Sequence, residues 1–162
     1  SLHTPAGVRA AYASGMARVV LSREMSLREI AEVHTACPVE LEAFVHGALC
    51  MSVSGQCYFS SMLGARSGNR GLCAQPCRLP FSTPGGTGHD LSLKDLSMIE
   101  RMGDLAQAGV VSAKIEGRMK SSYYVACVTR VYRAAIDAYL ANPAGYTMQD
   151  EWVSELQKIS HR

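Results

Sequence analysis

The stretch VELEAFVHGALC, residues 39–50, joins the two kinds of sequence that decide the fold. Apolar and other side chains alternate over residues 39–45, which predicts a strand. Residues 47–88 are instead rich in Gly, Ser, Cys and Pro and show no lasting period. So long an irregular segment is rare in a compact domain, so we expect an organising element, and a metal centre would supply one.

Regular patterns flank this segment on its N-terminal side. Residues 6–14 predict a short helix, and the β-branched run at residues 18–21 predicts a buried strand. A second helix is expected from residue 26 to about residue 35. It begins with a capping box, in which the Ser26 hydroxyl accepts from the backbone N–H of Glu29.

The C-terminal side returns to regular patterns. Leu96, Ile99 and Met102 begin an apolar stripe that predicts a helix from Leu93 to Gly109. A strand at 110–115, a long helix from Ser121 or Ser122 to about 140, and an amphipathic helix at 149–159 are expected to follow.

This alternation predicts an α/β fold with parallel strands, and a barrel is a reasonable subtype. About three complete strands are visible, which is too few for an eight-stranded barrel. The strand-like start at residues 1–3 also suggests a fragment of a longer protein. We therefore expect one partial domain, built from barrel units (1–46), a cysteine-rich segment (47–90), a later β/α unit (91–142) and a C-terminal helix (143–162).

Composition excludes several classes of protein. Hydrophobic residues make up 48% of the 162 residues and charged residues 19%, which is typical of a folded globular chain. No apolar run approaches the roughly 20 residues that span a bilayer, and no signal peptide is evident. We therefore expect a cytoplasmic protein with no membrane partner.

Four of the six cysteines fall within one short segment, as Cys50-x6-Cys57-x15-Cys73-x3-Cys77. Without an export signal, metal binding is favoured over disulfides. Four thiolates can hold an iron–sulfur cluster, but they can also hold structural zinc or remain free buried thiols. The spacing favours the cluster, because zinc ribbons usually pair closer knuckles. Cys37 and Cys127 are expected to be core residues.

Charged side chains follow the predicted strands, where a parallel barrel places its active site. Candidates for substrate binding or acid–base catalysis are Arg23 and Glu24 after the first strand, and Glu116 and Arg118 after the last. The alternative for each pair is a structural ion pair or a helix cap. His46 follows the middle strand and is a candidate for proton transfer or for a hydrogen bond near the cysteines.

No acidic residue occurs between Glu42 and Asp90, whereas three arginines do: Arg66, Arg70 and Arg78. With Lys120 they are candidates for contact with RNA phosphates or another anion. The alternatives are an ordinary solvated surface, or compensation for the charge of a metal–thiolate centre.

Six segments resemble, in order, the collagenase-like peptidases, which are family U, number thirty-two, among peptidases of unassigned catalytic type. They are VVLSRE (19–24), EAFVHGALC (42–50), SGQCYFS (54–60), RSGNRGLCAQPCR (66–78), LKDL (93–96) and KIEGRMK (114–120). Some members have a further cysteine where this chain has Ser97.

The resemblance implies a TIM-like barrel, of which this chain holds the later strands, with the N-terminal half of the same protein missing. It also implies a four-iron, four-sulfur cluster held by Cys50, Cys57, Cys73 and Cys77. Several relatives act in oxygen-independent hydroxylation of a tRNA uridine, a 23S ribosomal RNA cytidine or a ubiquinone precursor. The RNA-modifying members draw on prephenate-linked metabolism, and proteolysis is claimed for others.

Hydroxylation of a nucleobase in tRNA or ribosomal RNA is therefore the predicted function. The first alternative is a peptidase that acts on collagen-like or other proteins. Against it, the chain has neither a nucleophile elbow nor a His-Glu-x-x-His zinc helix. The second alternative is a non-catalytic subunit in which the cluster is structural.

Overall fold

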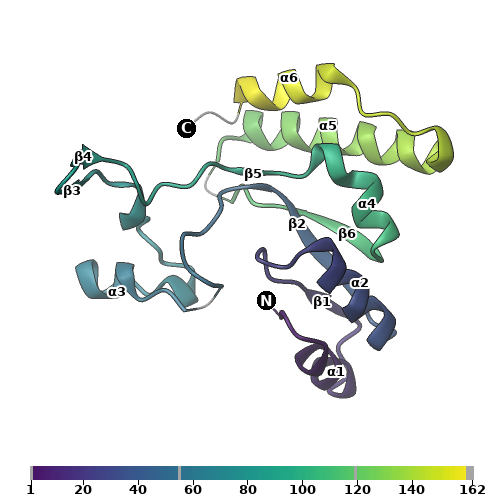
Figure 1. The fold of residues 1–162 in the computed structure, drawn as a ribbon, viewed down its shortest axis with the longest axis horizontal. Coiled ribbons are helices and arrows are strands. Elements are labelled where there is room, and N and C mark those ends of the chain that lie inside the picture. Colours follow the sequence, from purple (N-terminus) through teal and green to yellow (C-terminus); the bar gives the residue numbers. More distant parts are fainter. Residues whose placement is uncertain (1, 55, 119, 160–162) are drawn as a thin grey trace. The chain divides into compact units, whose positions relative to one another are not determined.

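The computed structural model describes residues 2–54, 56–118 and 120–159 (Figure 1). The chain divides into two compact units. The sheet unit comprises Ser1–Ala48 and Asp95–Arg162, and the cysteine unit comprises Leu49–Lys94.

The sheet unit is built on β2 (Glu40–Gly47). β1 (Arg18–Val20) and β6 (Val110–Ile115) both pair with β2 in parallel, as predicted. Leu2 adds a single parallel bridge to Leu21. Among the described residues the sheet has four strands, so the α/β class is confirmed while a closed barrel stays a prediction.

The helices of this unit occur in the predicted order along the chain (Figure 1). They are α1 (Pro5–Ala13), α2 (Leu27–Ala36), α4 (Met102–Gln107), α5 (Ser122–Ala141) and α6 (Asp150–Ile159), with short 3-10 turns at Ile99–Arg101 and Pro143–Gly145. The capping box of Ser26 and Glu29 is present. None of the helices described is long and apolar enough to cross a membrane.

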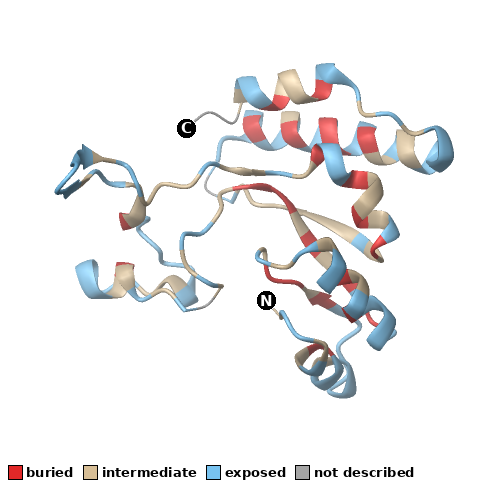
Figure 2. Ribbon diagram, viewed as in Figure 1, coloured by how far each residue is buried: buried red, intermediate tan, exposed pale blue. Residues whose placement is uncertain are grey.

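The core of the sheet unit lies between the sheet and its helices. Over residues 40–45 of β2 every second residue is buried, namely Leu41, Ala43 and Val45, because successive side chains of a strand point to opposite faces. α5 contributes Val128, Val131 and Ala135 to the same cluster. Figure 2 shows this buried stripe along α5 and β2.

The helix predicted from Leu93 is wrong at its N-terminal end. Residues Leu96–Ser97 form strand β5, antiparallel to β2, with Ser97 opposite His46 and Leu96 opposite Gly47. Helical structure begins only at Ile99. The helical spacing of Leu96 was misleading because pairing with β2, a tertiary contact, determines its conformation.

The cysteine unit is largely irregular, as predicted, but it contains short elements. These are α3 (Phe59–Gly64), 3-10 turns at Gly68–Arg70 and Pro76–Arg78, and a hairpin of β3 (Phe81–Thr83) and β4 (Gly86–Gly88). The turn predicted around Pro84 and Gly85 closes this hairpin. Among its described residues only Ser60 and Pro76 are buried, so the unit has no apolar core of its own.

Candidate functional site

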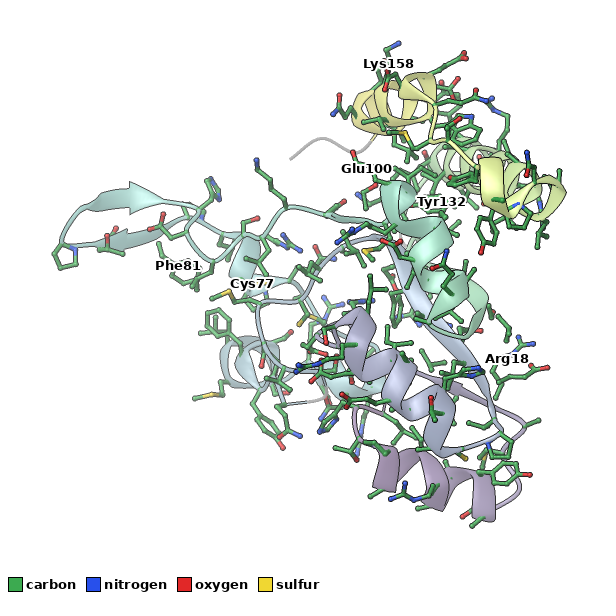
Figure 3. All side chains as sticks on the ribbon, turned by 45° about the vertical axis from the view of Figure 1, so that its right-hand side comes forward. Arg18, Cys77, Phe81, Glu100, Tyr132 and Lys158 are labelled. Atoms are coloured by element: carbon green, nitrogen blue, oxygen red, sulfur yellow. The ribbon has the colours of Figure 1, made fainter. Side chains whose placement is uncertain are left out.

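All four clustered cysteines line one pocket of the cysteine unit. The pocket has a volume of about 350 Å³, and apolar side chains such as Met51, Phe59 and Leu91 complete its wall. Figure 3 labels Cys77 and Phe81 in this unit. The fold of this unit thus brings together side chains from four separate points of an irregular segment.

Tight turns place the third and fourth cysteines. Gln75 has a left-handed backbone (φ 58°), and Pro76 then starts the 3-10 turn that contains Cys77. The backbone N–H of Gln75 donates to Sγ of Cys73 at 3.3 Å. Such N–H···S bonds stabilise a thiolate ligand.

The surroundings of Cys77 shift the pKa of its thiol in opposing directions. Burial raises the pKa of the Cys77 thiol, the neighbouring Arg78 guanidinium lowers it, and Cys50, Cys73 and Cys57 raise it further. The other cysteines raise this pKa because negative charges on neighbouring thiolates repel each other. A cationic metal centre would relieve this repulsion, because metal-bound thiols are deprotonated.

The residues of this pocket fit a metal centre by their chemistry. Four sulfur atoms are the donors that zinc and iron–sulfur clusters share. Among the described residues, no group of three or more His, Cys, Asp or Glu side chains is arranged to hold a single metal ion. Cys37 is buried and Cys127 is half-buried, and neither is among the described residues that line this pocket.

The predicted anion-binding residues have different surroundings. Arg78 donates to Leu49, Ser92 and Leu93 within the cysteine unit, and Arg66 donates to the backbone oxygen of Leu72 at 3.1 Å. Arg70 is exposed at the end of the 3-10 turn Gly68–Arg70. Lys120, in the sheet unit, lies 5.1 Å from the ring centre of Tyr124.

A second candidate site lies where the strands of the sheet unit end. A terminal nitrogen of Arg23 lies 3.5 Å from a carboxylate oxygen of Glu116, so residues from two predicted pairs meet. The Arg23 guanidinium also stacks over the ring of Phe44, 3.9 Å from its centre. Glu24 and Arg118 are exposed in the turns after β1 and β6.

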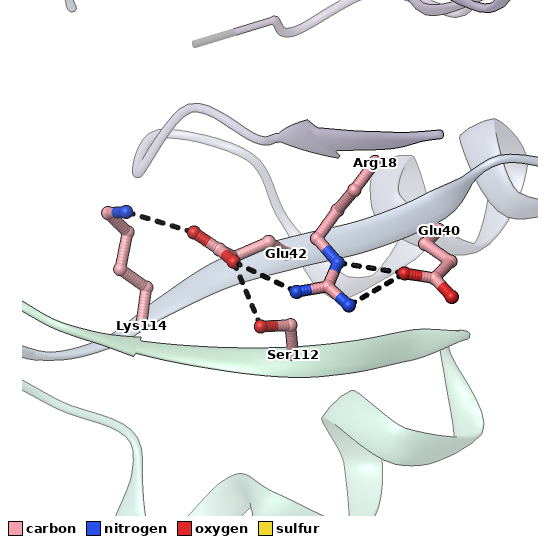
Figure 4. Close-up of polar contacts among 5 residues, drawn as sticks. All are labelled: Arg18, Glu40, Glu42, Ser112 and Lys114. Atoms are coloured by element: carbon pink, nitrogen blue, oxygen red, sulfur yellow. Dashed lines mark hydrogen bonds and ion pairs between the residues drawn. The ribbon is translucent and has the colours of Figure 1, made fainter. Parts of the chain in front are cut away.

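A charge network covers the same sheet face nearer the strand starts (Figure 4). Glu42 accepts from Lys114 and from Ser112, each at 2.9 Å, and Arg18 lies 3.8 Å away while pairing more closely with Glu40. The hydrogen bond from Lys114 is the main reason why the pKa of Glu42 lies below its ordinary value. This face is therefore polar, in contrast to the helix-covered face.

His46 lies in the core, with 2% of its surface exposed. Its Nδ1 is 3.3 Å from the hydroxyl of Tyr132 (labelled in Figure 3), and its ring also contacts Tyr124. Burial is the main reason why its pKa lies below the ordinary value. A catalytic role for His46 stays a prediction.

The structure adds three residues to this face that the sequence analysis did not predict as site residues: Phe44, Glu42 and Lys114. For two of them the sequence contained a signal. Alternation over residues 39–45 places Glu42 and Phe44 on the face opposite Leu41 and Ala43. The sequence marks Lys114 only as the first residue of the segment KIEGRMK. Its pairing with Glu42 depends on the register of β6 against β2, which the sequence does not give.

Comparison with known proteins settles the family. The family model described as peptidase family U32 matches residues 1–162. The chain belongs to peptidase family U32. The resemblance inferred from the sequence segments is therefore confirmed, and the cysteine pocket lies within the part of the chain that this family shares.

Relatives within peptidase family U32 carry different names. The chain is 44% identical to tRNA hydroxylation protein P1 of Bacillus subtilis, over 91% of this chain and 38% of that protein. It is 40% identical to the 23S rRNA 5-hydroxycytidine C2501 synthase of Escherichia coli, over 91% of this chain and 25% of that protein. It is 35% identical to a collagenase of Porphyromonas gingivalis, over 89% of this chain and 40% of that protein.

The chain therefore spans less than half the length of these curated relatives of family U32. No solved structure matches it.

Proposed function

We propose that the chain belongs to a protein that hydroxylates a nucleobase in tRNA or 23S ribosomal RNA, with an iron–sulfur cluster held by the four clustered cysteines. The convergence of Cys50, Cys57, Cys73 and Cys77 on one pocket carries this proposal. Relatives at 44% and 40% identity are named for tRNA and rRNA hydroxylation.

The lack of an apolar core in the cysteine unit supports the cluster. Small folded units that bury little apolar surface usually need a metal or disulfides for stability. All six cysteines lie among the described residues, and none of them forms a disulfide there. A four-iron, four-sulfur cluster would supply both a covalent core and electron transfer.

The residues at the strand ends would position the substrate. Arg23, fixed by Phe44 and Glu116, presents a cation and a planar surface, which suit a base or a phosphate. Glu24 and Arg118 extend this site. Arg66, Arg70 and Lys120 would contact RNA phosphates, and an oxygen donor linked to prephenate is the one that the family resemblance suggests.

We also propose that the α/β fold is a TIM-like barrel, completed by parts of the longer protein. The parallel order of Leu2, β1, β2 and β6 fits an arc of such a barrel, and the polar face with Glu42 and Lys114 would then line its interior. We place the protein in the cytoplasm, where its RNA substrates occur.

Metal analysis and nucleoside analysis test the proposal together. Full-length protein purified without oxygen should contain about four iron and four sulfide per chain. A deletion strain should lose one hydroxylated nucleoside from tRNA or rRNA, as measured by mass spectrometry, and wild-type protein should restore it. Zinc as the only bound metal would contradict the cluster, and unchanged nucleosides would contradict the activity.

A peptidase is the second candidate, because one relative is named as a collagenase. Gelatin cleavage by purified full-length protein that survives Cys50→Ser would favour it. If neither hydroxylation nor cleavage occurs while iron is bound, the cluster is structural.

A further inference from the structure

Arg78 joins separate parts of the cysteine unit through its guanidinium. One terminal nitrogen donates to the backbone oxygen of Leu49 at 2.8 Å. The other donates to the backbone oxygen of Leu93 at 2.6 Å and to a nearby serine hydroxyl at 3.1 Å. Because Leu49 precedes Cys50 and Arg78 follows Cys77, this side chain ties the first cysteine's backbone to the fourth's.

Ser60 makes a comparable link between the other two cysteines. The residue is buried, with 4% of its surface exposed, and its Oγ accepts from the backbone N–H of Ala74 at 2.9 Å. Ser60 is at the start of α3, shortly after Cys57, and Ala74 directly follows Cys73. This hydrogen bond from a buried serine oxygen to the neighbouring segment fixes the distance between the two backbones.

These contacts sort the four cysteines into two pairs, Cys50 with Cys77 and Cys57 with Cys73. We propose that Arg78 and Ser60 are positioning residues that hold these pairs together before any metal is bound. This inference rests on the proposed function, since the assembled pocket would receive the cluster.

Geometry rather than charge is the basis of this role for Arg78. Arginine presents several N–H donors in a rigid planar fork, which here reaches two backbone carbonyls and a hydroxyl at once. Lysine keeps the positive charge but is a compact point donor. Arg78→Lys therefore separates a positioning role from a role in phosphate binding or charge compensation.

Chemical cross-linking of the full-length protein, freed of iron and reduced, tests the pairing directly. Dibromobimane joins two nearby thiols, and peptide mass spectrometry identifies which cysteines are joined. Arg78→Lys and Arg78→Ala should lower the Cys50–Cys77 yield about fivefold, the ratio expected for loss of one net hydrogen bond, and leave the Cys57–Cys73 yield unchanged. Ser60→Ala should have the converse effect.

Arg70→Ala is the matched control, because it removes an exposed arginine of the same unit. It should change neither yield. Wild-type yields for both pairs in Arg78→Lys would overturn the role of Arg78. Ser60→Ala removes a single oxygen atom, so it keeps the test decisive if the Arg78 variants do not fold.

Iron uptake gives a second measurement. After anaerobic addition of ferrous iron and sulfide, the visible absorption of the cluster should appear more slowly in Arg78→Lys and Ser60→Ala than in wild type or Arg70→Ala. Equal rates in all four proteins would overturn the proposal. If the wild type binds no iron, the proposed function fails, whereas the cross-link yields still decide the pairing.

Discussion

Gly47 shows how one residue allows the strand-end site to form. Its backbone has φ +111°, and a Cβ atom at this position would lie 2.2 Å from the backbone oxygen of Glu116. The N–H of Glu116 also donates to the backbone oxygen of His46 at 2.8 Å. Only glycine allows β2 and the turn after β6 to approach so closely.

Gly47→Ala should therefore lower the free energy of unfolding by about 2 kcal/mol or more, through backbone strain and the clash together. Urea denaturation of the full-length protein measures this change. Gly64→Ala is the control, since nothing lies within 4 Å of the added Cβ. Equal stability of the two variants would contradict the close approach.

His46 gives a prediction about pH. Burial keeps its folded-state pKa below the ordinary value of 6.5, so the unfolded chain binds a proton first as the pH falls. The stability that neutral His46 contributes to the folded protein is complete above about pH 6.5 and declines below it. Between pH 7.5 and 5.5 the wild type should lose more stability than His46→Phe, as measured by urea denaturation at each pH. Parallel losses would contradict this prediction.

At the scale of elements, short-range signals located most helices. The capping box at Ser26 and the strands beside β2 were predicted because local pattern and tertiary packing agree there. β5 and the β3–β4 hairpin were missed. Each has only two or three residues per strand, and cross-strand hydrogen bonds rather than periodicity define them.

The sequence offers Ser121 and Ser122 as N-caps of α5. The structure assigns the cap to Ser121, whose Oγ accepts from the backbone N–H of Tyr124 at 3.2 Å. Ser121→Ala should lower the free energy of unfolding by about 1 kcal/mol. Ser122→Ala, one residue further and already helical, should change it by less than about 0.5 kcal/mol. Thermal unfolding of both variants makes the comparison, and a larger loss for Ser122→Ala would assign the cap to Ser122.

At the scale of the whole molecule, the two units have different sources of stability. The sheet unit has a continuous apolar core, whereas only Ser60 and Pro76 are buried among the described residues of the cysteine unit. If the proposed cluster replaces an apolar core, its removal should affect mainly one unit.

Hydrogen exchange followed by mass spectrometry tests this difference. Iron removal from the full-length protein should increase exchange across residues 49–94, while β1, β2, β6 and α5 keep their protection. Addition of iron and sulfide should restore the original pattern. Equal exchange in the cysteine unit with and without iron would show that the metal does not stabilise it.

The sequence by itself determined the α/β class, the family and the four cysteines, because periodicity, caps and motif spacing are local properties of the chain. Only the tertiary structure decided which side chains meet. The Arg23–Glu116 contact, the Lys114–Glu42 hydrogen bond and the contacts of Arg78 join residues far apart in sequence. Their distances depend on strand register and loop packing, which local patterns do not encode.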